Sequence, residues 1–148
     1  MVSYWTLDES FDDLVGGNDG TQSGGVTNAT GISSGAMNFD GVDDHIQIPD
    51  SSSLDLNGDM TFSFWMNSED LTSNALRIIH KNSAYQIASA VTATGGSNSL
   101  RLYNYNDASY CMSNQIYTEN EWNYVTIVQN SGTCYFYKNG ENIGAQDN

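Results

Sequence analysis

The chain has 148 residues, of which 39% are hydrophobic, so it is long enough for one domain with a buried core. Its 18 acidic residues outnumber 4 basic residues, which gives a net charge of −14. Because this charge repels phosphate backbones and anionic lipid surfaces, we expect no nucleic-acid binding. No apolar run reaches the length of about 18 residues that a membrane-spanning helix needs, so we also expect no membrane insertion.

Apolar and polar residues alternate with a period of two along much of the chain, and no helical period is sustained. About ten to twelve short strands separated by Gly-rich turns predict an all-β fold, in which two antiparallel sheets pack as a single domain over residues 1–148. In chain order, we expect strands at residues 3–7, 25–28, 36–39, 45–48, 60–66, 77–80, 85–91, 100–105, 122–129, 133–138 and 141–145.

The segment 37–49 carries the strongest local signal. An Asp40-Gly41 pair separates two alternating stretches, and the second stretch places Ile46 and Ile48 on one face. Gly accepts the positive φ that a tight turn requires, so the pattern predicts that 36–39 and 45–48 pair as a hairpin.

This hairpin is followed by three further segments in a fixed order. Together they resemble the laminin-G-like, concanavalin-A-like lectin/glucanase jelly-roll family, which implies a two-sheet β-sandwich used mostly for binding. The segments that carry the resemblance are 35–46, 61–65, 122–128 and 135–140.

The resemblance also implies a closing strand, because members of this family usually continue for another segment after the strand that follows the Asn139-Gly140 turn. The sequence ends at Asn148. We therefore expect the closing strand to be missing and a sheet edge to be exposed, which proteins normally cover. A partner chain, including a second copy in a homo-oligomer, or an atypical local strand would cover the edge. The alternative is that the sequence is part of a longer protein.

Two loops are rich in oxygen ligands and are candidates for calcium, which prefers carboxylate and carbonyl oxygens. The resemblance supports this cofactor, because members of the family often carry calcium at the rim. The alternative is that these side chains bond only their own backbone in Asx turns. The candidate ligands are Asp13, Asn18 and Asp19 in the first loop, and Asp43 and Asp44 in the second.

Aromatic and amide side chains cluster in the segment 103–110 and are candidates for a glycan site, since sugars stack on ring faces and bond to planar polar groups. The alternative is that the aromatic residues are ordinary core and cross-strand partners. The candidate ligand-binding residues are Tyr103, Tyr105, Asp107 and Tyr110, together with Trp65 on a more distant strand.

Cys111 and Cys134 each lie in a β-like stretch and allow at most one disulfide; the alternative is two buried free thiols. Catalytic motifs are weak. Gly31–Gly35 matches a Gly-x-Ser-x-Gly pattern without the required strand–turn–helix context, and Glu119 and Glu121 lack the strand motif of jelly-roll glucanases. We therefore expect no enzyme activity.

The sequence and the resemblance together predict a non-catalytic extracellular binding module for carbohydrate recognition or adhesion, assisted by calcium. Its partner would be a glycan or a cell-surface or virion protein. The alternative is a structural or assembly module of a virion, tail fibre or cell-surface array that acts through protein–protein contacts. The expected location is extracellular, at the cell surface or at the virion surface.

Overall fold

The computed structural model describes residues 1–70, 76–90, 99–106, 108–114 and 117–147. They form two compact units, residues 1–55 and 56–148; the single domain expected from the sequence stays a prediction. The fold class is all-β, as predicted, and the one helix in the described residues is the 3-10 helix η1 (Ser52–Leu54). No helix in this part of the chain is long and apolar enough to cross a membrane.

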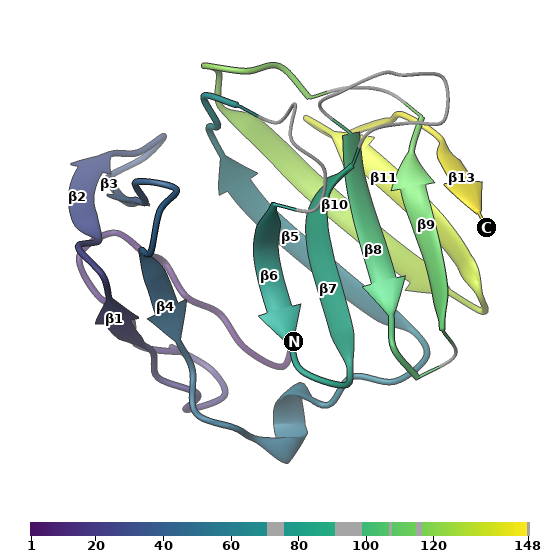
Figure 1. Cartoon of the computed structure of the whole chain (residues 1–148), viewed down its shortest axis with the longest axis horizontal. Coiled ribbons are helices and arrows are strands. Elements are labelled where there is room, and N and C mark those ends of the chain that lie inside the picture. Colours follow the sequence, from purple (N-terminus) through teal and green to yellow (C-terminus); the bar gives the residue numbers. More distant parts are fainter. Residues whose placement is uncertain (71–75, 91–98, 107, 115–116, 148) are drawn as a thin grey trace. The chain divides into compact units, whose positions relative to one another are not determined.

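The second unit is a sandwich of two antiparallel sheets, which Figure 1 shows as two separate layers. The four-stranded sheet has the order β12 (Glu141–Asn142), β11 (Thr133–Lys138), β10 (Asn123–Asn130), β5 (Met60–Met66). The five-stranded sheet has the order β13 (Ala145–Asp147), β9 (Ser109–Ser113), β8 (Ser99–Asn104), β7 (Tyr85–Ala90), β6 (Arg77–Lys81).

The core of this unit lies between the two sheets, because alternate residues of each strand point inward. Ile87 and Leu102 on one sheet and Ile127 and Phe136 on the other are each at most 1% exposed. The strand expected at 60–66 is confirmed, and its burial alternates: Met60 is buried, Phe62, Phe64 and Met66 pack against the core, and Trp65 is exposed.

The two sheets are joined covalently as well. Cys111 on β9 and Cys134 on β11 form a disulfide with their Cα atoms 6.4 Å apart. The expected strands at 122–129 and 133–138 are confirmed as β10 and β11, which pair as a hairpin with a two-residue turn at Ser131 and Gly132, whose φ angles are +50° and +81°. This turn conformation matches the twist of the flanking strands, and Gly adopts it without a steric cost.

The last residues of the chain pair with the five-stranded sheet. β13 runs antiparallel to β9, so a local strand of three residues covers that edge. At the opposite edge, β6 carries Arg77 and Lys81 and a register shift between Arg77 and Ile79. Charged side chains and irregular register both discourage strand addition at an edge. Cover by a partner chain stays a prediction.

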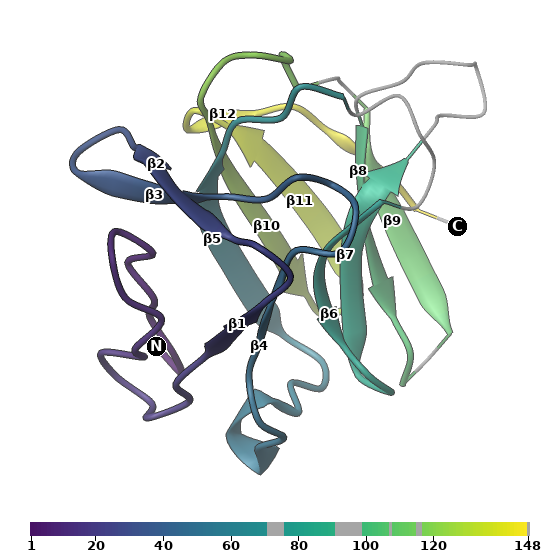
Figure 2. The ribbon, with the colours of Figure 1, turned by 60° about the vertical axis from the view of Figure 1, so that its left-hand side comes forward.

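The first unit corrects the predicted hairpin of 36–39 with 45–48. β3 (Gly35–Asn38) pairs with β2 (Thr27–Thr30), and β4 (His45–Gln47) pairs with β1 (Thr21–Ser23), as Figure 2 shows. The reason is the loop 39–44, which is too long for a two-residue turn and is held by side-chain bonds. Gly41 has the expected positive φ of +75°, but Asp40 and Asp44 accept backbone amides of the loop, which leaves β3 free to pair with the preceding strand.

The expected first strand at 3–7 is also wrong, because this segment makes only an isolated bridge between Trp5 and Asp13. Leu7 has a φ of +54°, which ends the extended conformation. The Tyr4 amide donates its hydrogen bond to the Asp13 side chain and not to a neighbouring strand.

Candidate functional site

The outer face of the five-stranded sheet brings several predicted ligand-binding residues together. Cross-strand register places His80 opposite Gln86, Gln86 opposite Tyr103, and Tyr103 opposite Tyr110, so these side chains form one row across β6, β7, β8 and β9. Tyr105 follows β8 directly and joins the row through its ring. We call these five residues the tyrosine surface.

The rings of the tyrosine surface contact one another. The Tyr103 ring centroid lies 4.6 Å from that of Tyr105, at 63° between planes, and 6.4 Å from that of Tyr110, at 18°. The His80 ring meets Tyr105 edge-on at 6.1 Å. Such contacts fix ring orientation in advance, which lowers the entropic cost of binding a ligand.

Polar groups accompany the rings. The Tyr105 hydroxyl donates a hydrogen bond of 2.9 Å to Gln86 Oε1, and the Arg101 guanidinium lies 5.7 Å from the Tyr110 ring centroid. Tyr105 keeps 40% of its surface exposed. The surface therefore offers the accessible ring of Tyr105 beside hydroxyl and guanidinium groups, while Gln86, which is buried, supports the Tyr105 hydroxyl from below.

Two predicted members of this site do not join it. Trp65 lies on β5, in the other sheet, and its ring contacts that of its cross-strand neighbour Tyr124 with the centroids 5.1 Å apart. Asp107 lies outside the described residues. Sequence reasoning missed the contributions of Gln86 and Arg101, because only cross-strand register places them beside the tyrosines.

The first candidate calcium loop is occupied by its own hydrogen bonds. Asp13 Oδ1 accepts the amides of Tyr4 at 2.8 Å and Val15 at 3.0 Å, and Asp13 Oδ2 accepts the backbone and side-chain nitrogens of Asn18, both at 3.1 Å. Asp19 Oδ1 in turn accepts the Asp13 amide at 2.9 Å. This geometry is that of a carboxylate organising a loop, the Asx-turn alternative that the sequence left open.

Hydrogen bonds also explain the acidity of Asp13, which is 7% exposed. Burial opposes its ionisation, but hydrogen bonds from the Tyr4 and Gly16 amides, the Ser3 hydroxyl and the Val15 amide outweigh burial and hold the pKa of the carboxyl far below its ordinary value. The loop therefore folds with Asp13 as an ionised carboxylate.

The second loop gathers three carboxylates whose oxygen atoms lie within 4.8 Å of one another, those of Asp40, Asp43 and Asp44. Asp40 Oδ1 accepts the Val42 amide at 2.8 Å, and the Asp44 carboxylate accepts the amides of Asp40 and Gly25. The bond from Val42, followed by those from Asp43 and Asp44, holds the pKa of Asp40 below its ordinary value. The structure thus brings the carboxylate of Asp40 together with those of the predicted ligands Asp43 and Asp44.

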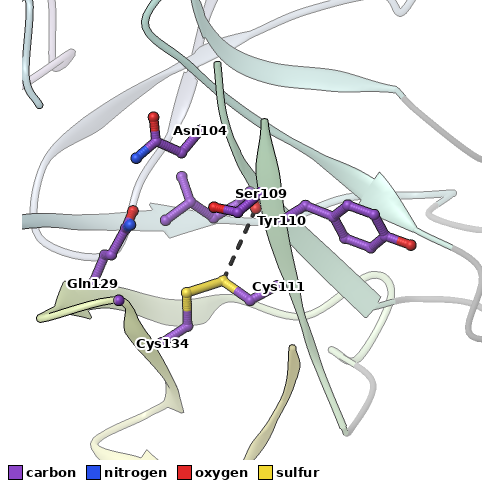
Figure 3. Close-up of a pocket in the computed structure, with 8 residues that line it drawn as sticks. Asn104, Ser109, Tyr110, Cys111, Gln129 and Cys134 are labelled. Carbon is purple, nitrogen blue, oxygen red and sulfur yellow. Dashed lines mark hydrogen bonds between the residues drawn. A yellow bond between two sulfur atoms is a disulfide. The ribbon is translucent and has the colours of Figure 1, made fainter. Parts of the chain in front are cut away.

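A small pocket of about 70 Å³ lies beside the disulfide, and Figure 3 shows its lining. Asn104 and Gln129 contribute amides, while the Tyr110 ring points away from the pocket. The Oε1 atom of Gln129 is buried without a hydrogen-bond partner among the described residues. A polar pocket of this volume suits a few water molecules and is too small for a sugar ring.

The weak catalytic motifs occupy turns. Glu119 and Glu121 flank Asn120, which has a φ of +57°, and Ser33 lies in the turn between β2 and β3. A strand follows Ser33, whereas a nucleophile elbow needs a helix there.

Comparison with known proteins gives a family. A model of the Concanavalin A-like lectin/glucanases superfamily matches residues 40–148, which is more than half of the chain and includes the whole tyrosine surface. No curated protein and no solved structure matches the chain.

Proposed function

Because the chain belongs to the Concanavalin A-like lectin/glucanases superfamily, we propose that it is a non-catalytic carbohydrate-binding module that acts in recognition or adhesion outside the cell. The observation that carries the proposal is the tyrosine surface, where the Tyr103 ring contacts the rings of Tyr105 and Tyr110 on one face of a sheet.

Ring faces and polar groups act on different parts of a sugar. The C–H groups of a pyranose ring are apolar and pack against the face of an exposed ring such as that of Tyr105, while sugar hydroxyls bond to the tyrosine hydroxyls; Gln86 is buried and holds the Tyr105 hydroxyl in place. Because these groups lie on strands, the sheet holds them in place before the ligand arrives.

Charge favours this class of ligand over the obvious competitors for aromatic surfaces. Bases of single-stranded nucleic acid also stack on aromatic rings, but their phosphates need a positive groove. The chain carries 4 basic residues against 18 acidic ones. A neutral glycan meets no long-range repulsion from this field.

The disulfide supports the extracellular location in this proposal. Bonds such as that of Cys111 with Cys134 persist in oxidising compartments and are rare in the cytosol. The glycan would then be part of a cell surface, a virion surface or an extracellular matrix.

Calcium assistance is proposed at one loop only. Asp40, Asp43 and Asp44 converge within 4.8 Å, and hard carboxylate oxygens are the ligands that calcium prefers. The ion would supply positive charge that neutralises this cluster and stiffens the loop 39–44. The Asp13 loop fits less well, since among the described residues no three carboxylates converge there as they do in the loop 39–44.

A glycan array tests the proposal, with Tyr105→Ala and Tyr105→Phe beside the wild type. We expect Tyr105→Ala to weaken binding about tenfold or more, and Tyr105→Phe to keep most of it because the ring remains. Tyr4→Ala removes a similarly exposed ring at 48% exposure in the other unit and serves as the matched control. Equal array profiles for Tyr105→Ala and the wild type would contradict the proposal.

A further inference from the structure

The outer face of the four-stranded sheet carries a second group of exposed rings. Trp65 on β5 and Tyr135 on β11 are 49% and 39% exposed, and between them in the sheet lie Tyr124 on β10 and Tyr137 on β11. We call these four residues the tryptophan surface. It shares no residue with the tyrosine surface and lies on the opposite side of the sandwich.

The register sets the order of the rings across this face. Trp65 is paired with Tyr124 across β5 and β10, and their ring centroids are 5.1 Å apart at 41°. Tyr137 and Tyr135 follow on β11, opposite Thr126 and Val128 of β10. The four rings therefore run diagonally over three adjacent strands.

The length of this diagonal indicates the size of its ligand. Neighbouring strands lie about 4.8 Å apart and alternate residues of one strand about 6.8 Å apart, so the path from Trp65 through Tyr124 and Tyr137 to Tyr135 measures about 20 Å. Several consecutive sugar rings are needed to cover that distance, and a single monosaccharide cannot contact all four aromatic residues.

The polar residues of the face are neutral. The outward positions between the rings include Ser63 and Thr126, whose hydroxyl oxygens lie 3.1 Å apart, and no outward position of β5, β10 or β11 is acidic or basic. This absence of charge stands out in a chain with a net charge of −14. A neutral polymer with hydroxyl groups complements such a face.

Charge also decides between a glycan and a second copy of the chain. Two copies would each bring the net charge of −14 to the contact, and this repulsion opposes association. The face is also poor in aliphatic residues, with Val128 as its one outward aliphatic side chain on β5, β10 and β11.

We propose that the tryptophan surface binds a linear neutral polysaccharide, so that one molecule holds two glycan chains, one on each side of its sandwich. The inference rests on the proposed function for the tyrosine surface. Its new content is bivalency, which lets a monomer bridge glycan-coated particles without any oligomer.

The test measures binding and bridging separately. The probes are particles of four insoluble neutral polysaccharides: cellulose, β-1,3-glucan, mannan and starch. Co-sedimentation measures binding and turbidity measures clustering of particles, with Trp65→Ala, Tyr105→Ala, the double variant and the Tyr4→Ala control beside the wild type. Light scattering determines the oligomeric state, and Trp65→Phe checks that a smaller ring keeps the function.

The wild type should bind and cluster the particles of at least one polysaccharide as a monomer. Trp65→Ala should still bind, with at least tenfold less clustering, and the double variant should lose both. Three results would overturn the inference: clustering by Trp65→Ala at the wild-type level, a wild-type dimer that Trp65→Ala dissociates, or no binding of the wild type to any of the particles. If Tyr105→Ala binds normally while Trp65→Ala does not bind, the function proposed for the tyrosine surface fails and bivalency fails with it, although the tryptophan surface still binds a glycan.

Discussion

Cys111 on β9 and Cys134 on β11 form the covalent link between the two sheets, across 23 residues of sequence. Both cysteines are at least nine-tenths buried at the core. Closing a loop of this length removes conformational entropy from the unfolded chain, and we expect the disulfide to contribute about 3 kcal/mol to stability.

Urea denaturation with and without reductant measures this contribution. The double variant Cys111→Ala, Cys134→Ala should unfold at lower urea by the same amount as the reduced wild type, with no further effect of reductant. An unchanged urea midpoint for the reduced wild type would contradict the expected contribution of the disulfide to stability.

The carboxylate of Asp13 should stabilise the N-terminal loop, since it accepts the amides of Tyr4, Val15 and Asn18. Asp13→Asn should lower the Tm at pH 7, while Asp12→Asn, at an exposed neighbouring position, should not. Thermal unfolding measured for both variants checks this. Equal Tm values for the two variants would contradict the prediction, because they would show that the charge of Asp13 does not stabilise the loop.

The stability of the wild type should fall with acid for the same reason. The pKa of Asp13 is lowered from its ordinary value of 3.8, so the stabilisation is fully present above pH 4 and is lost as the pH falls further, towards the folded-state pKa. The difference in Tm between wild type and Asp13→Asn should shrink below about pH 4. A Tm difference that grows as the pH falls would contradict a lowered pKa of Asp13 in the folded state.

Calcium should raise the Tm if Asp40, Asp43 and Asp44 bind it. A site made of few protein ligands falls in the weak range, with a Kd of about 10⁻⁴ to 10⁻³ M, so 10 mM calcium should stabilise by about 1.4 to 2.7 kcal/mol. Asp43→Asn should abolish the shift, and Asp12→Asn should keep it. Magnesium at the same concentration controls for general screening of the acidic charge.

The β10–β11 turn should need Gly132 because of its positive φ, and not because a side chain there would clash. Its φ is +81°, and a Cβ built there meets nothing within 4 Å. Gly132→Ala should therefore cost about 1 to 2 kcal/mol from the left-handed conformation, and Gly132→Asn less. Urea denaturation checks the order of the two variants; equal stability of Gly132→Ala and wild type would contradict it.

Local patterns predicted the second unit better than the first. The strands expected at 60–66, 122–129 and 133–138 are encoded by neighbouring residues, and all three are confirmed. The pairing of β3 and β4 failed because a long loop, whose amides bond to Asp40 and Asp44, replaces a tight turn.

The candidate sites depended on register, which composition does not reveal. Tyr103 and Tyr110 could be predicted to lie close together because one short segment contains both, and they face each other across β8 and β9. Gln86 and Trp65 could not be assigned correctly, since the pairing of strands far apart in the sequence decides which sheet face each one joins.

Isothermal titration of the strongest array glycan tests carbohydrate recognition by the tyrosine surface most directly. Tyr103 contacts both other rings of this surface, so Tyr103→Ala should raise the Kd about tenfold or more, while Tyr4→Ala leaves it unchanged. Circular dichroism and the Tm establish that Tyr103→Ala is folded. A folded Tyr103→Ala with the wild-type Kd would contradict the account.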